Sequence, residues 1–144
     1  MEKIAIYPGS FDPVTLGHLH IIQRASPLFD NLVIGIGINA DKRSLFQPEQ
    51  RVELLQSVTG KLPNVRVEVF TGLAVDFVRE IGARVMVRGI RPLTDIAGEF
   101  TMMMANQQLD PEIETVFLMA AERYAHVSSS LLKQIAMLSD DDEQ

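Results

Sequence analysis

The sequence contains no cysteine among its 144 residues. The chain therefore cannot form disulfides, thiolate metal sites or a cysteine nucleophile, and this composition fits a reducing compartment. It also has no apolar run near the roughly 20 residues of a membrane span. The apolar run at its start is too short for a signal peptide. We therefore expect a cytoplasmic protein that does not associate with membranes.

Basic residues are also scarce: the chain has 13 Lys and Arg and 19 Asp and Glu, which gives a formal net charge of −6. Four of the negative charges lie at residues 140–143, which leaves the rest of the chain near −2. Without a broad basic face the chain is poorly suited to sequence-independent nucleic-acid binding, although a few local cations suffice for a small anion. We interpret residues 139–144 as a solvated acidic tail.

The whole chain is 47% hydrophobic, and residues 1–138 are long enough to form one core, so we expect a single domain there. Short β-branched runs alternate with amphipathic segments, which predicts a Rossmann-like α/β fold: a five-stranded parallel sheet with helices on both faces. Strands are expected at 4–7, 32–36, 65–70, 84–88 and 114–118. Helices are expected at 15–29, 48–58, 73–81, 94–107 and 129–138.

Ligands of such sheets bind where the strands end and the helices begin, and the first such loop fits an anion site. Thr15 is placed to cap a helix by accepting from the backbone N–H of His18, and the free N–H groups of that turn favour phosphate. Gly17 is costly inside a helix unless something must approach the backbone closely. The alternative is an ordinary turn with a capping histidine.

Three other strand-end loops carry groups suited to phosphate. Arg88 and Arg91 flank Gly89 at the end of the fourth predicted strand, and guanidinium groups chelate phosphate oxygens. The hydroxyls at residues 128–130 open the last predicted helix, and Lys42 follows the second predicted strand. Taken alone, each group has a plainer explanation as a surface arginine, a serine cap or a solvated lysine. Their combination favours a phosphate-binding site.

Several other motifs are absent or incomplete. The glycines at 35 and 37 lack the third glycine of a dinucleotide fingerprint, and no P-loop sequence occurs. The histidines show no metal-ligand spacing, so we expect no protein-held metal. The methionines at 102–104 are expected to pack one face of a helix.

Taken in order, these motifs resemble the T-x-G-H nucleotidyltransferases, and specifically the phosphopantetheine adenylyltransferase family. The resemblance runs from residue 3 to about 138. It comprises Tyr-Pro-Gly-Ser-Phe-Asp-Pro at 7–13, Thr-x-Gly-His at 15–18, Lys42, Gln-Arg-Val at 50–52, Arg-Gly-Ile-Arg at 88–91, Glu99, Phe-Leu-Met at 117–119 and Val-Ser-Ser-Ser at 127–130.

The resemblance implies reversible AMP transfer from ATP to 4′-phosphopantetheine, giving 3′-dephospho-CoA and pyrophosphate in coenzyme A biosynthesis. It implies Mg²⁺ held mainly by ATP, a homohexamer, and CoA as a further ligand. The catalytic residues would be His18, Lys42 and Arg91. The phosphopantetheine site would comprise Ser10, Lys42, Ala74, in the loop before the third helix, and Arg88. The ATP site would comprise Ser10, Phe11, His18, Gly89, Ile90, Arg91, Glu99, Tyr124, Ala125, His126, Val127, Ser128, Ser129 and Ser130.

The chain departs from the family pattern at His20, Gly98 and Tyr124, where the resemblance implies an acidic residue, an aromatic residue and tryptophan. It also has an acidic tail in place of a further C-terminal helix. Two rival functions stay open at this point. One is a related transferase acting on nicotinamide mononucleotide or glycerol phosphate, and the other is a nucleotide-binding regulatory module without chemistry.

Overall fold

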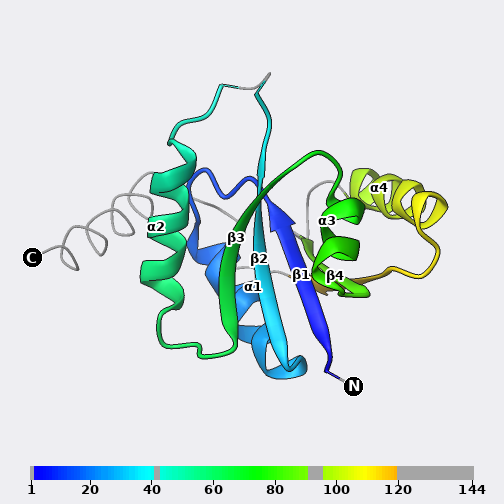
Figure 1. The fold of residues 1–144 in the computed structure, drawn as a ribbon, viewed down its shortest axis with the longest axis horizontal. Coiled ribbons are helices and arrows are strands. Elements are labelled where there is room, and N and C mark those ends of the chain that lie inside the picture. Colours follow the sequence, from blue (N-terminus) through cyan, green and yellow to red (C-terminus); the bar gives the residue numbers. More distant parts are fainter. Residues whose placement is uncertain (1, 41–42, 91–95, 120–144) are drawn as a thin grey trace, which may run out of the picture.

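A computed structural model describes residues 2–40, 43–90 and 96–119 of the chain (Figure 1). The strands are β1 (Ile4–Gly9), β2 (Asn31–Ile38), β3 (Val65–Thr71), β4 (Val85–Ile90) and β5 (Glu114–Met119). The helices are α1 (Leu16–Ala25), α2 (Pro48–Thr59), α3 (Ala74–Ile81) and α4 (Ile96–Leu109), with a short 3₁₀ helix, η1 (Ser26–Leu28). None of the helices in these ranges is long and apolar enough to cross a membrane.

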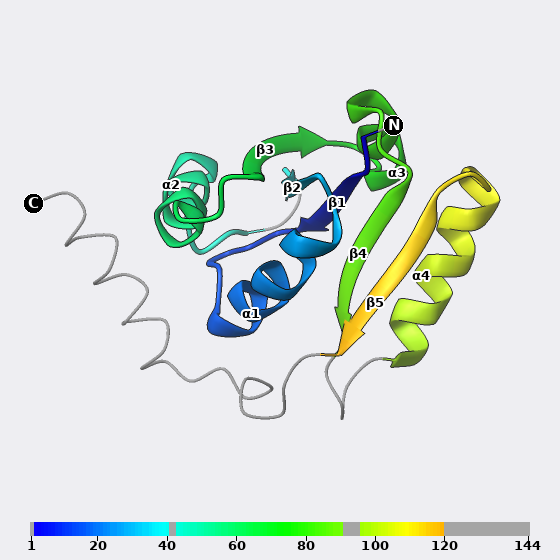
Figure 2. The same ribbon diagram turned by 90° about the horizontal axis from the view of Figure 1, so that it is seen from below.

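The five strands form one parallel sheet in the order β3-β2-β1-β4-β5. The chain moves outward from β1 through β2 to β3, and then returns across β1 to β4 and β5. Since crossovers between parallel strands are right-handed, this reversal sends the connecting helices to opposite faces. Helices α1 and α2 cover one face and α3 and α4 the other (Figure 2). The predicted fold class is confirmed.

Each face of the sheet has its own hydrophobic core. Neighbouring residues of β1 point to opposite faces, as strand geometry requires: Ala5 packs in the core under α1 and α2, and Ile6 packs in the core beside α3. Helix α1 contributes Ile21 and Ile22 to the first core, and α3 contributes Val75 and Val78 to the second. The central strands β1 and β2 are therefore buried on both sides, as their continuous apolar sequences predict.

Some of the predictions about the elements need correction, and others lie beyond the described residues. The helix expected over 15–29 ends at Ala25 and continues as η1, because Pro27 lacks the N–H that an α-helix needs. Ala74 is the first residue of α3 and does not lie in the loop before it. The helix predicted at 129–138 and the tail at 139–144 lie outside the described residues, as do the first two residues of the helix predicted at 94–107.

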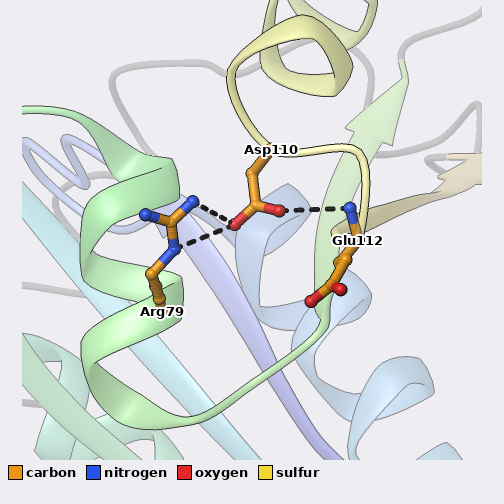
Figure 3. A network of polar contacts seen from close by, with 3 residues as sticks. All are labelled: Arg79, Asp110 and Glu112. Atoms are coloured by element: carbon orange, nitrogen blue, oxygen red, sulfur yellow. Dashed lines mark hydrogen bonds and ion pairs between the residues drawn. The ribbon is translucent and has the colours of Figure 1, made fainter.

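The end of α3 is joined to the loop between α4 and β5 by polar contacts (Figure 3). Arg79 donates from Nε and Nη2 to Oδ2 of Asp110 at 3.0 and 2.6 Å, and the backbone N–H of Glu112 donates to Oδ1 at 3.1 Å. The hydrogen bonds from Arg79 are the main cause that lowers the pKa of Asp110. Because the folded-state pKa is lowered, ionised Asp110 stabilises the fold above its ordinary pKa. That stability is lost as pH falls through the folded-state value.

Candidate active site

A cavity of about 270 Å³ lies beside the C-terminal ends of β1 and β4. These two neighbouring strands send their chains to opposite faces of the sheet, and ligands of open parallel sheets bind at this kind of switch point. Its walls come from the turn after β1, the first turns of α1, the end of β4 and the start of α4. The lining residues are Tyr7, Pro8, Gly9, Ser10, Phe11, Thr15, Gly17, His18, Ile21, Arg88, Gly89 and Glu99.

Thr15 and His18 fix each other at the start of α1. The backbone N–H of His18 donates to Oγ1 of Thr15 at 3.2 Å, and the backbone N–H of Thr15 donates to Nδ1 of His18 at 3.0 Å. This reciprocal capping box confirms the predicted cap. Because Nδ1 accepts a hydrogen bond, the ring proton of neutral His18 belongs on Nε2. The imidazole can therefore act as a hydrogen-bond donor through Nε2.

Phe11 anchors the turn between β1 and α1. Its backbone adopts a φ of +45°, which is rare for a residue with a side chain. Phe11 as a whole is 1% exposed, and its ring packs edge-to-face against Tyr7 and His18, with centroid separations of 5.2 and 4.9 Å. The buried ring of Phe11 therefore supports the imidazole of His18.

Arg88 joins three parts of the cavity. Its Nε and Nη2 donate to the two carboxylate oxygens of Glu99 at 3.1 and 2.8 Å, and its Nη1 donates to the carbonyl of Pro8 at 2.7 Å. The Arg88 and Glu99 side chains are 25% and 20% exposed. A bidentate pair with this much burial fixes the plane of the guanidinium group.

Two further residues that were not predicted as site residues brace the turn from behind. Arg51 is only 4% exposed, and its Nη1 donates to the carbonyl of Ser10 at 3.1 Å. The Asp12 carboxylate accepts from the backbone N–H groups of Leu45 and Phe46, each at 2.7 Å. The burial of Arg51 could have been predicted from the sequence, because Arg51 shares the apolar face of α2 with buried leucines three and four residues later. No feature of the sequence near Asp12 indicated that its carboxylate binds the backbone of Leu45 and Phe46.

Six predicted site residues line this one cavity: Ser10, Phe11, His18, Arg88, Gly89 and Glu99. Two others, Ile90 and Ala74, are described but are not part of its lining. A Cβ added at Gly89 would lie 3.2 Å from Cγ1 of Ile21, so this glycine lets β4 approach α1. The remaining predicted residues lie outside the described ranges: Lys42, Arg91, Tyr124, Ala125, His126, Val127, Ser128, Ser129 and Ser130.

Among the described residues, the carboxylate that lines the cavity is that of Glu99, and both of its oxygens bind Arg88. Across residues 2–40, 43–90 and 96–119, no three His, Asp or Glu side chains gather in a way that could hold a metal ion.

The chain matches a family model described as cytidylyltransferase-like over residues 6–135. It is 78% identical over 142 residues to a phosphopantetheine adenylyltransferase of Rhodopirellula baltica, covering 99% of this chain and 79% of the relative. It is 50% identical over 134 residues to a protein of the same name from Clostridium botulinum, covering 93% of this chain and 84% of the relative.

Two solved structures share the fold. A bifunctional NMN adenylyltransferase/ADP ribose pyrophosphatase from Francisella tularensis has a TM-score of 0.68 at 17% identity, covering 100% of this chain and 51% of that one. A lipopolysaccharide core biosynthesis protein from Thermoplasma volcanium has a TM-score of 0.58 at 19% identity, covering 84% and 98%. Because it is 50–78% identical to these two relatives over nearly its whole length, the chain belongs to the phosphopantetheine adenylyltransferase family of nucleotidyltransferases.

Proposed function

We propose that the cavity at the C-terminal ends of β1 and β4 binds ATP beside 4′-phosphopantetheine, and that the protein transfers AMP from ATP to this acceptor. The chain is a pantetheine-phosphate adenylyltransferase that forms 3′-dephospho-CoA and pyrophosphate, a step of coenzyme A biosynthesis. The observation that carries the site assignment is the meeting of His18, Ser10 and Arg88 around one cavity at the switch point of the sheet. Sequence identity of 78% to a relative of that name supports the reaction.

His18 would stabilise the charge that develops on the α-phosphate. A phosphate oxygen of 4′-phosphopantetheine attacks the α-phosphorus of ATP, a new P–O bond forms, and the bond to pyrophosphate breaks. Charge then builds on the α-phosphate oxygens, and a donor already aimed at them lowers the barrier without reorganising. Because Nδ1 accepts a hydrogen bond from Thr15, the ring proton of neutral His18 belongs on Nε2, and Nε2–H would be the donor. The fixed ring of Phe11 limits how far the imidazole can tilt.

Binding and alignment of the two phosphates would supply most of the remaining rate enhancement. Ser10 is exposed at the mouth of the turn, and the first N–H groups of α1 present partial positive charge to an anion. We assign the phosphate of 4′-phosphopantetheine to Ser10, Lys42 and Arg88. Arg91 and residues 124–130 would bind the nucleotide, as the family resemblance implies.

The proposal includes Mg²⁺ bound through the ATP phosphates, where it would neutralise part of the triphosphate charge. The lining suits that arrangement, because the Glu99 carboxylate is paired with Arg88 through both of its oxygens. We also propose a cytoplasmic location, in keeping with the cysteine-free sequence. Titration of activity with Mg²⁺ at fixed ATP tests the first point.

Assembly into a homohexamer, with CoA as a further ligand, completes the proposal. Helix α4 supports self-association: none of its residues is buried in the described part of the chain, and its large apolar side chains are about half exposed. Of the methionines at 102–104, which were expected to pack one face of a helix, Met102 and Met104 are 53% and 58% exposed on α4. Light scattering at micromolar concentration measures the assembly, and a monodisperse monomer would contradict it.

The test of the site is His18→Ala, with ATP binding measured by calorimetry and turnover by pyrophosphate release. We expect turnover to fall by roughly 100-fold or more, as for loss of a donor to a developing oxyanion, and the Kd for ATP to change little. Equal losses in binding and turnover would identify His18 as a structural cap alone. Comparing 4′-phosphopantetheine with nicotinamide mononucleotide and glycerol phosphate as acceptors tests the substrate assignment.

A further inference from the structure

We propose that Arg51 is a positioning residue of the reaction, and that it acts from outside the cavity on the peptide that joins Ser10 to Phe11. It holds the Ser10 carbonyl and thereby directs the Phe11 backbone N–H at a phosphate group of the bound substrates. The proposal rests on the function assigned above, in which Ser10 and Phe11 belong to the substrate site. Arg51 is not part of the cavity lining, so it would act without touching either substrate.

The carbonyl of the Ser10–Phe11 peptide is held by Arg51. Nη1 of Arg51 donates to this carbonyl at 3.1 Å. A trans peptide is planar, so its C=O and N–H point in opposite directions and move together. Fixing the Ser10 carbonyl toward α2 therefore fixes the Phe11 N–H away from α2. Because Ser10 and Phe11 line the cavity and Arg51 does not, we infer that this N–H is directed to the cavity side of the turn.

Packing fixes the same peptide from its other side. The φ angle of Phe11 describes rotation between this peptide and the rest of the residue, and its value of +45° is rare for a residue with a side chain. Phe11 is 1% exposed, and its ring packs against Tyr7 and His18. A return to a commoner φ would have to disturb the ring or break the bond to Arg51. Strained backbone held in this way is typical of functional sites.

The Phe11 N–H is available to a ligand. Within the described residues, no backbone or side-chain acceptor forms a hydrogen bond with it. Backbone N–H groups in folded proteins are nearly always paired, with protein, water or ligand. Phosphate oxygens are common partners of such groups in turns that precede a helix. A phosphate in the cavity would therefore satisfy this N–H.

The burial of Arg51 is better explained by this role than by stability. Arg51 is 4% exposed and forms no ion pair within the described ranges, where its Nε is also buried without a hydrogen-bond partner. Burying a charged group in this way costs free energy. Residues that break the rules of packing at a cost to the fold are expected at functional sites. The buried charge also favours an anion nearby.

The test is Arg51→Met, which keeps an unbranched stem in the core and removes the charge and the donor to Ser10. We expect kcat/KM for 4′-phosphopantetheine to fall about 10- to 100-fold, since small misplacements of a binding group cost this much. The Tm should stay within about 3 °C of wild type or rise, because an unpaired buried charge is removed. Arg66→Met is the matched control, since Arg66 is half exposed on β3 and pairs with Glu68, and it should change neither quantity.

A purely structural role for Arg51 predicts the reverse result. The Tm of Arg51→Met would then fall, and the folded fraction would keep the wild-type kcat/KM. That combination would overturn the proposal.

The Ser10–Phe11 peptide can also be observed directly, because serine is followed by phenylalanine only once in the sequence. Serine labelled with ¹³C at the carbonyl and phenylalanine labelled with ¹⁵N give one signal that reports on this peptide alone. ATP and 4′-phosphopantetheine, added separately, should identify which phosphate shifts the wild-type signal, and a shift with neither would overturn the proposal. In Arg51→Met the signal of the free protein should move, and its shift on adding the ligand should become smaller.

Arg51→Lys is a second variant, which carries the test if methionine prevents folding. It keeps the positive charge, but its ammonium group is one bond short of the guanidinium nitrogen that reaches Ser10. We therefore expect kcat/KM to fall about 3- to 10-fold and the peptide signal to move. An unmoved signal, or a moved signal with wild-type kcat/KM, would overturn the proposal.

The two proposals fail in different ways. If the wild-type chain shows the ligand-induced shift and Arg51→Met weakens it, but no pyrophosphate is released with 4′-phosphopantetheine, the proposed reaction is wrong and the positioning by Arg51 stands. If the wild-type chain is active and Arg51→Met keeps its kcat/KM, the reaction stands and the positioning by Arg51 is wrong.

Discussion

Gly35 lies in β2 against a stacked pair of aromatic rings, and replacing it by alanine tests how tightly this face of the sheet is packed. Phe70 from β3 and Phe77 from α3 stack with centroids 4.6 Å apart and ring planes 9° from parallel. A Cβ added at Gly35 would lie 2.8 Å from Cε2 of Phe77 and 3.2 Å from Cε1 of Phe70. Carbon atoms do not approach this closely without strain, so one ring or the strand must move.

We expect Gly35→Ala to lower the free energy of unfolding by about 1–3 kcal/mol, the usual range for an extra methyl group forced into a packed core. For a domain of this size that corresponds to a fall in Tm of roughly 3–10 °C. The loss should be the same at every pH where the fold is stable, because no charge is involved. It should also leave the slope of urea unfolding unchanged, since the surface exposed on unfolding is nearly the same.

Urea and thermal unfolding, followed by circular dichroism, measure the effect, and Gly60→Ala is the matched control. Gly60 has a φ of −60° and a ψ of −20°, and its added Cβ would come no closer than 3.4 Å to Gln56. Alanine fits there without strain, so the control should be neutral or up to about 1 kcal/mol more stable. If Gly35→Ala matched the wild type, or if both variants lost equal stability, the packing argument would be refuted.

Three further predictions concern the polar contacts. Asp110→Asn should destabilise the chain at pH 7, and the gap to wild type in urea unfolding should narrow as pH falls below the ordinary aspartate pKa of about 4 and close once pH falls through the lowered folded-state pKa of Asp110; a gap that is constant with pH would contradict this. Thr15→Ala should cost about 1 kcal/mol of stability by removing the cap of α1, measured by thermal unfolding against Thr15→Ser, which should retain most of it. Asp12→Ala should speed hydrogen exchange of the Leu45 and Phe46 amides, with unchanged exchange in α3 as the reference.

The fold was predictable because its signals are local. Each buried strand is a short β-branched run that ends near a turn residue, and all five predicted strands overlap the observed ones. The error at the end of α1 is also local, since Pro27 could have been interpreted as a stop to the helix. Apolar periodicity continues through Leu28, which favoured a longer helix than the backbone allows.

The site was predictable only in part. The rule that ligands bind at strand ends brought Ser10, His18 and Arg88 together correctly, because it depends on topology alone. The bond from Arg88 to Glu99 joins β4 to α4, and the bonds of Asp12 cross 33 and 34 residues of chain. Such pairings depend on side-chain geometry in the folded chain, which periodicity and spacing do not encode.

The most direct test of the account is to incubate the purified chain with ATP, Mg²⁺ and 4′-phosphopantetheine, and to measure pyrophosphate together with the mass of the modified acceptor. The account predicts one pyrophosphate for each 3′-dephospho-CoA formed, none without 4′-phosphopantetheine, and release that is roughly 100-fold slower or more with His18→Ala. Tight ATP binding without acceptor-dependent pyrophosphate release, or equal release with another phosphate acceptor, would contradict it.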